Sequence, residues 1–100
     1  MIELEDAVME IIVNAGQSRS LCFEAIHAAR HGNIDEAKLL LNEADGYARR
    51  AHQMQTQLIE QDAGEARQPM TLIMVHAQDH LMNSLLAREF SQEIIHLYQR

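Results

Sequence analysis

The chain has 100 residues, of which 47% are hydrophobic, and its 15 acidic and 8 basic side chains give a formal net charge of -7 at pH 7. This length predicts one domain over residues 1–100, with a core too small to bury every apolar side chain. The acidic balance, without a Lys/Arg cluster, excludes nucleic acid and anionic membrane surfaces as expected partners.

Cysteine and hydropathy indicate the compartment. Cys22 is the one cysteine in the sequence, which excludes an internal disulfide framework and fits a reducing environment. The start, MIELEDAVMEIIV, carries acidic residues where a signal peptide needs positive charge. No apolar run reaches the length of a membrane span. We therefore expect a cytoplasmic protein with no direct membrane insertion.

The first helix is predicted over about residues 3–30. Helix-forming residues dominate the chain, and Leu4, Val8, Ile11 and Ala15 begin an apolar pattern with a period near 3.6. The pattern breaks at His31-Gly32-Asn33, where glycine is typical of a helix stop.

The second helix is predicted over about residues 34–61. Asn33 is a favourable N-cap residue, and Glu36 follows it three positions later, as in a capping box. Gly16 in the first helix and Gly46 in the second each cost roughly 1 kcal/mol relative to alanine. Either a close approach between helices or a kink explains them.

The third helix is predicted over about residues 69–98, with Pro69 in its first turn. Short connections make neighbouring helices antiparallel, so the sequence predicts an all-α, up-down-up three-helix bundle.

Two apolar stripes run along the third predicted helix. The first follows coiled-coil spacing, and the second is rotated around the helix. One stripe can face the other helices of the same chain, and the other is then most simply explained by self-association. The first stripe contains Val75, Asp79, Met82 and Leu86, and the second contains Met74, Ala77, Leu81 and Leu85.

Asp79 interrupts the first stripe with a carboxylate. If that stripe lies on a rotation axis, the carboxylates of several chains converge, and either they become partly protonated or a cation lies between them. A threefold axis would suit Mg²⁺, with water completing its shell. The other interpretation is a bond between Asp79 and a histidine at the bundle surface.

His76 and His80 are one helical turn apart, and Asp79 shares their broad side of the helix. The segment HAQDH lacks the glutamate that follows the first histidine of the HExxH zinc motif, which argues against a zinc protease. An imidazole with one free nitrogen can instead act as a nucleophile in phosphoryl transfer, with neighbouring donors for the phosphate oxygens.

Four segments together resemble a known family. They are IIVNAGQSRSL, HGNIDEAKLLL, AHQMQTQLIEQDAGEAR and VHAQDHLM. The sequence resembles the lactose/chitobiose (cellobiose) class of enzyme IIA in the bacterial phosphoenolpyruvate-dependent sugar phosphotransferase system. The resemblance covers almost the whole chain, and VHAQDHLM is its most specific part.

This resemblance implies a homotrimer of three-helix subunits and a phosphotransferase component with a phosphohistidine intermediate. His76 would accept phosphate from HPr and give it to the cognate enzyme IIB, in the uptake of β-disaccharides such as lactose, cellobiose or chitobiose. It further implies that Asp79 binds a divalent cation, Mg²⁺ by our expectation, at the trimer axis, and that Gln78 and His80 lie near the phosphate. The alternative is a non-catalytic helical trimer adaptor, in which polar residues of the stripe only set the register.

Overall fold

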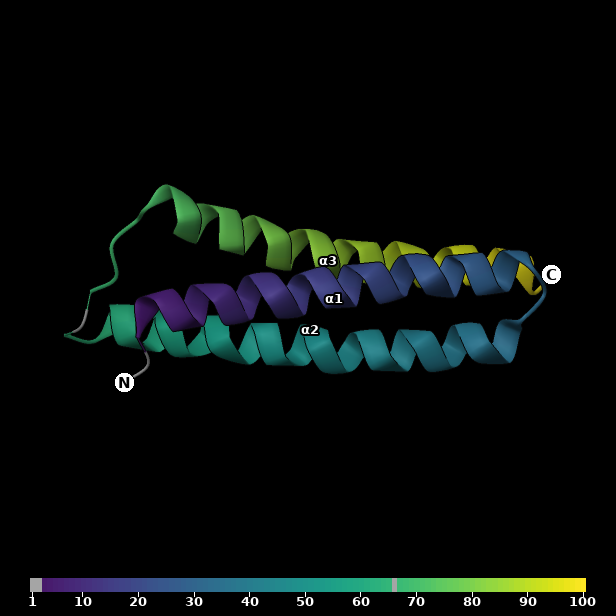
Figure 1. Cartoon of the computed structure of the whole chain (residues 1–100), viewed down its shortest axis with the longest axis horizontal. Helices are drawn as coiled ribbons and strands as arrows, with labels where there is room; N and C mark the ends of the chain where they lie inside the picture. Colours follow the sequence, from purple (N-terminus) through teal and green to yellow (C-terminus); the bar gives the residue numbers. More distant parts are fainter. Residues whose placement is uncertain (1–2, 66) are drawn as a thin grey trace.

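The computed structural model describes residues 3–65 and 67–100, and it folds as a bundle of helices α1 (Leu4–Arg30), α2 (Ile34–Ala63) and α3 (Leu72–Tyr98). The bundle is elongated, with extents of 52 × 20 × 18 Å. Figure 1 shows α1 and α3 running in one direction and α2 running in the opposite direction, with α1 drawn between the other two. The described residues contain no strand. The predicted all-α, up-down-up fold is therefore confirmed.

The turn between α1 and α2 forms as the sequence predicts. Gly32 has a φ of 86°, the left-handed conformation that glycine adopts without steric cost. Its N–H donates to the carbonyl of Ala29 at 3.0 Å, and the N–H of Asn33 donates to that of Ala28 at 2.8 Å. These two bonds define a Schellman motif. Asn33 then occupies the N-cap of α2, although its side chain makes no capping hydrogen bond.

The predicted start of the third helix is wrong by three residues, because α3 begins at Leu72 rather than at Pro69. Thr71 is the N-cap, and its hydroxyl accepts a hydrogen bond from the N–H of Met74 at 3.2 Å. The carboxylate of Asp62 accepts one from the N–H of Gln68 at 2.8 Å. A side-chain cap satisfies a free N–H of the first turn, which proline cannot do. The helix therefore starts at the threonine.

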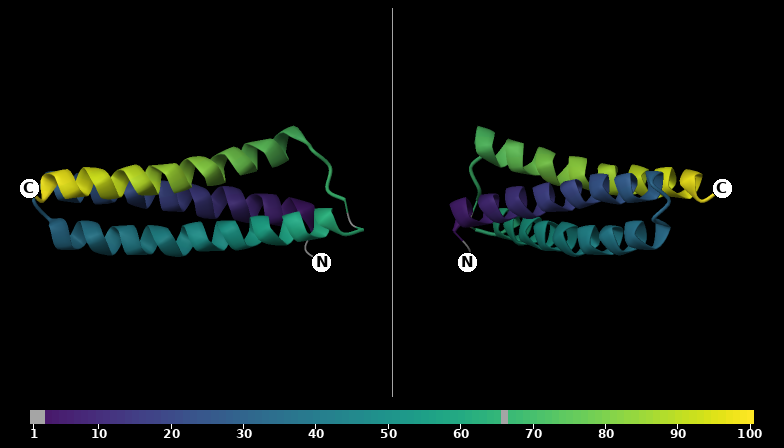
Figure 2. Two further views of the ribbon diagram at one scale, coloured as in Figure 1. Left: turned by 180° about the vertical axis from the view of Figure 1, so that it is seen from behind. Right: turned by 45° about the vertical axis from the view of Figure 1, so that its right-hand side comes forward.

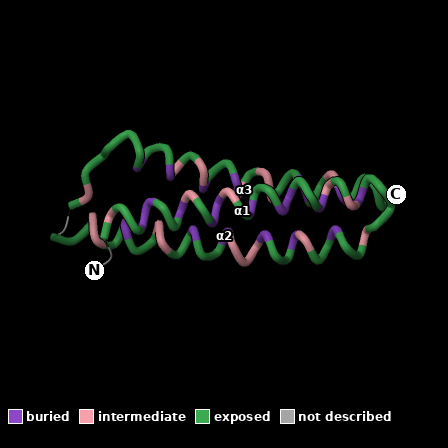
Figure 3. Tube along the Cα trace, viewed as in Figure 1, coloured by how far each residue is buried: buried purple, intermediate pink, exposed green. Residues whose placement is uncertain are grey.

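Small side chains fill much of the core, to which all three helices contribute. Figure 3 shows the buried positions recurring along the inward side of each helix. Two clusters form, one at each end of the bundle. Half of the buried apolar residues are alanines, which lets the helices pack closely. They are Ala7, Ala15, Ala25, Ala29, Ala37, Ala44, Ala48, Ala51 and Ala77.

The two stripes of α3 separate as predicted. Met74, Ala77 and Leu81 are at most 5% exposed and face the other helices. The stripe that contains Asp79 faces outward over the whole length of the helix. Its large apolar members are 42–85% exposed, and they are Leu72, Val75, Met82, Leu86, Phe90 and Leu97. We call these six residues and Asp79 the outer stripe.

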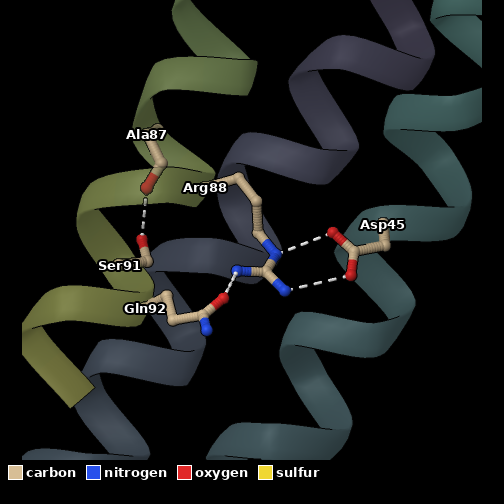
Figure 4. A network of polar contacts seen from close by, with 5 residues as sticks. All are labelled: Asp45, Ala87, Arg88, Ser91 and Gln92. Atoms are coloured by element: carbon tan, nitrogen blue, oxygen red, sulfur yellow. Dashed lines mark hydrogen bonds and ion pairs between the residues drawn. The ribbon is translucent and has the colours of Figure 1, made fainter. Parts of the chain in front are cut away.

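α2 and α3 share fewer contacts with each other than either shares with α1. Figure 2 shows from two further directions that α3 diverges from the other helices toward its N-terminal end. Near the middle of the helices, Arg88 of α3 reaches Asp45 of α2 in the polar network of Figure 4.

Neither helix glycine is explained by a close approach within one chain. A Cβ atom at Gly16 or Gly46 would meet nothing within 4 Å. Among the described residues, no helix has both the length and the hydropathy that crossing a membrane requires.

Candidate active site

His76 lies in the second turn of α3, and its side chain is exposed. It forms one wall of a shallow cavity of about 470 Å³, which is lined by Leu72, Ile73, Val75, His76 and Asp79. Three of these five residues are exposed apolar side chains beside two polar groups. The site therefore offers an exposed imidazole on an apolar surface that is open to a macromolecule.

His80 follows one turn later and contacts the first imidazole. The Nε2 atoms of His76 and His80 are 3.0 Å apart, and the ring centroids are separated by 4.5 Å with an interplanar angle of 88°. In this hydrogen bond one Nε2 carries the hydrogen and the other accepts it. The structure thus brings together the two histidines that the sequence places in the site.

Asp79 lies on the outer stripe and lines the same cavity as His76. Its side chain is exposed, and Val75 and Met82, one turn away on either side, are also exposed. Within the described residues, no group of three His, Cys, Asp or Glu side chains is placed to hold a metal ion. Asp79 is thus the one carboxylate in the lining of this cavity, among exposed apolar side chains.

Gln78 points to the other flank of α3. Its side-chain carbonyl accepts a hydrogen bond from the Nε2 amide of Gln55 on α2. It also lines a separate cavity of about 220 Å³ with Leu58, Ile59 and Met74. Within one chain, Gln78 therefore lies away from His76 and His80.

Part of this separation is readable from the sequence. Side chains two positions apart point about 200° apart around an α-helix, so Gln78 and His76 cannot share a face. The partner Gln55, by contrast, is 23 positions earlier in the chain, and no local pattern in the sequence indicates it.

A three-helix bundle that presents an imidazole pair beside an exposed apolar cavity is a small domain suited to docking with other proteins. Residues 6–99 match the family described as "PTS system, Lactose/Cellobiose specific IIA subunit". The chain belongs to this family, and it is a sugar-specific IIA component of the phosphotransferase system. It is accordingly a phosphotransferase component.

Individual relatives agree with this membership. The chain is 46% identical over 98 residues to the N,N'-diacetylchitobiose-specific EIIA component of Escherichia coli K12, covering 98% of this chain and 84% of the relative. The crystal structure of the cellobiose-specific enzyme IIA from Bacillus anthracis superposes with a TM-score of 0.93 at 34% identity, covering 99% of this chain and 92% of that one.

A third relative was solved with a partner. In the solution structures of the IIA(chitobiose)–HPr complex of Escherichia coli, the matching chain has a TM-score of 0.85 and 44% identity to this one. The match covers 99% of this chain and 96% of that chain.

Proposed function

We propose that this protein accepts a phosphoryl group from phospho-HPr on His76 and passes it to its cognate enzyme IIB. The observation that carries the proposal is the position of His76, exposed at the edge of an apolar cavity on α3. Apolar surface around a nucleophile suits transient docking of two carriers in turn. The complex between a similar IIA protein and HPr supports the same donor here.

Each transfer forms one P–N or P–S bond as another breaks. In the first step an unprotonated nitrogen of His76 attacks phosphorus, and the P–N bond of phospho-HPr breaks with the electron pair returning to the HPr imidazole. In the second step a thiolate of enzyme IIB attacks the phosphohistidine, and His76 is the leaving group. Exclusion of water by the docked partner protects the phosphoryl group from hydrolysis.

His80 is a donor beside His76 in the same chain. Its Nε2 is 3.0 Å from the Nε2 of His76, so it can donate a hydrogen bond to an oxygen of a phosphoryl group carried by His76. In the unphosphorylated pair, one Nε2 donates the hydrogen bond between the rings and the other accepts it. The hydrogen bond also orients the two rings relative to each other.

Gln78 would reach the phosphate from a neighbouring subunit. With Asp79 at the centre of the outer stripe, His76 lies on one flank of α3 and Gln78 lies on the opposite flank. In a cyclic assembly around the outer stripe, one flank of each copy faces the opposite flank of the next. Gln55, which holds Gln78, then acts as a positioning residue for that contact.

The assembly that fits the outer stripe is a homotrimer. Six large apolar side chains along one face of α3 are exposed in a single chain, and packing three copies of α3 on a common axis would bury them. Three copies of Asp79 would converge at one level of that axis. This arrangement repeats the same contact in every subunit and closes the assembly.

The converging carboxylates fit a hard divalent cation, and Mg²⁺ is the ion that we propose. Exposed Asp79 is a suitable oxygen ligand, and its flanking residues are apolar, so unneutralised charges buried there would repel one another. A bound cation supplies positive charge at this level, while water completes its shell. Its contribution is to assembly, and the phosphoryl relay passes through His76 alone.

The pathway would serve β-linked disaccharides of the lactose, cellobiose or chitobiose type. The family is described as lactose- and cellobiose-specific, and the similar Escherichia coli protein as specific for N,N'-diacetylchitobiose. This component would contact protein carriers and not the sugar. The relay would operate in the cytoplasm, as expected from the sequence.

The test is phosphorylation by phosphoenolpyruvate, enzyme I and HPr. We expect an alkali-stable, acid-labile label on the wild type and on His52→Ala, which alters an exposed histidine of α2. His76→Ala should take up no label while its circular dichroism stays helical. Label that persists in His76→Ala overturns the assignment. An unlabelled wild type that still assembles would favour the non-catalytic adaptor.

A further inference from the structure

We propose that His76 and His80 together chelate a divalent transition metal such as Zn²⁺, and that the bound metal prevents His76 from accepting phosphate. The second half of this proposal rests on the proposed function of His76. The first half, metal binding by the pair, stands on geometry alone. This site is separate from the axial Asp79 position in both its ligands and its preferred ion.

The distance between the two nitrogens carries the proposal. Zinc binds imidazole nitrogen at about 2.0–2.1 Å, so two ligands of one ion lie about 2.9 Å apart at a right angle and about 3.3–3.4 Å apart at a tetrahedral angle. The Nε2 atoms of His76 and His80 are 3.0 Å apart. An ion can therefore bind both nitrogens with small side-chain rotations and no change in the helix.

The proton count also permits binding. In the resting pair one Nε2 holds a hydrogen, and metal binding requires a lone pair on both. The hydrogen moves to Nδ1 of the same neutral ring, so the pair changes tautomer and loses no proton. Both Nε2 lone pairs then point at the metal, and Nε2 of His76 is no longer available as a nucleophile or hydrogen-bond partner.

The ligand type selects the metal. Two imidazoles favour Zn²⁺, Cu²⁺ or Ni²⁺ over Mg²⁺, which prefers oxygen. Within the described chain, no third His, Cys, Asp or Glu side chain completes the pair, so water would fill the remaining positions. A site with two protein ligands and an exposed histidine binds reversibly, in contrast to a closed structural zinc site.

A second pair in the same protein provides a matched control. His27 in the last turn of α1 and His31 at its C-cap have the same spacing, but their rings are nearly parallel, at 16°, with centroids 6.4 Å apart. Nδ1 of His31 is 2.8 Å from the carbonyl oxygen of His27, and Nε2 of His27 is 3.4 Å from the guanidinium of Arg30. These contacts hold the two rings apart, so spacing alone does not create the converging geometry.

Direct metal binding is measured by calorimetric titration of the intact protein with ZnCl₂, in a buffer that does not bind zinc. The wild type and His31→Gln should bind with the same affinity. His76→Gln and His80→Gln should each weaken binding by about tenfold or more, because a chelate becomes a single ligand. Equal affinity in the wild type and both site variants, or an equal loss in His31→Gln, overturns the metal site.

The effect on transfer is measured with purified phospho-HPr, so that enzyme I is absent. Zn²⁺ at concentrations that saturate the titrated site should reduce labelling of the wild type by about tenfold, and a chelator should restore it. Mg²⁺ at the same concentration should leave labelling unchanged. Saturating zinc that leaves the rate unchanged overturns the blocking role.

The two proposals fail in distinguishable ways. A wild type that takes no label without zinc defeats the proposed function, and the calorimetric result for the histidine pair is unaffected by it. Zinc binding that does not depend on His76 or His80 overturns the proposed metal site. That result would leave the labelling of His76 in zinc-free buffer, and so the proposed function, unchanged.

Discussion

Arg88 and Asp45 form a two-pronged ion pair that ties α3 to α2. Nε of Arg88 donates to one carboxylate oxygen at 2.7 Å, and Nη2 donates to the other at 3.0 Å. The remaining Nη1 donates to Gln92 at 2.7 Å, which completes the network in Figure 4. Since α2 and α3 otherwise share few contacts, this pair fixes their relative position near the middle of the bundle.

Removing the carboxylate should have a modest cost. The side chains of Arg88 and Asp45 are 21% and 36% exposed, so solvent screens much of their attraction. Asp45→Ala should lower the free energy of unfolding by about 1 kcal/mol. Urea denaturation at low and high salt measures this, and the difference between wild type and variant should shrink in high salt. A difference that grows with salt would contradict an ion pair.

The glycines should respond in opposite directions. Gly32→Ala should cost about 1 kcal/mol, because a left-handed φ of 86° strains any residue with a Cβ. Gly46→Ala should stabilise by about 0.5–1 kcal/mol, because the added Cβ meets nothing and alanine favours a helix. Thermal unfolding of both variants provides the comparison. Destabilisation by Gly46→Ala would show that a second copy packs against that position.

The outer stripe should govern assembly. Leu86 is 51% exposed on α3, and Leu86→Lys would place a charge on the proposed axis, so the trimer should dissociate. Leu39→Lys is the control, because Leu39 is 66% exposed on α2 and lies outside the stripe. Sedimentation velocity reports the mass of each. A Leu86→Lys protein of the same mass as wild type would exclude α3 as the axis.

Asp79→Leu should remove axial Mg²⁺ while leaving the helices intact. Replacing converging carboxylates with apolar side chains removes a desolvation cost, so the assembly should be at least as stable as the wild type. Metal analysis after gel filtration in Mg²⁺ gives the stoichiometry, and circular dichroism gives the helix content. Unchanged bound Mg²⁺ in Asp79→Leu would place the ion elsewhere.

Cys22 should make stability fall at alkaline pH. Burial raises the pKa of its thiol above the ordinary value of 9.0, against the opposing effects of a side-chain hydrogen bond with Ser91 and the charge of Arg88. The unfolded chain then loses the thiol proton at lower pH than the folded one, so the free energy of unfolding falls above pH 9.0. Cys22→Ala should show a shallower fall in urea titrations over that range. An identical slope in both proteins would contradict the linkage.

Local patterns predicted most of the fold. Gly32 ends α1 as expected, and the two stripes of α3 have the burial that their spacing predicted, because both depend on one helix at a time. The start of α3 was misplaced because Pro69 and Thr71 are both acceptable near a helix start, and the cap to Met74 decided between them.

The candidate site was predicted in part. His76 and His80 share one face because a single helical turn separates them, but spacing alone does not fix the contact between their rings. The pairs Gln55–Gln78 and Asp45–Arg88 each join α2 to α3. Their contacts depend on the position of α2 along the axis of α3. No periodicity within either helix fixes that register. The axial cation and the trimer stay predictions, since they depend on relations between copies of the chain.

The alanine-rich interior has a consequence for how the protein would behave on dilution. Alanine occupies half of the buried apolar positions, so a single chain buries little apolar surface and gains little folding free energy from it. Larger side chains such as Phe90, which is 60% exposed, would be buried only by another copy of the chain. Folding and association would then be one coupled equilibrium, and the melting temperature would rise with total concentration.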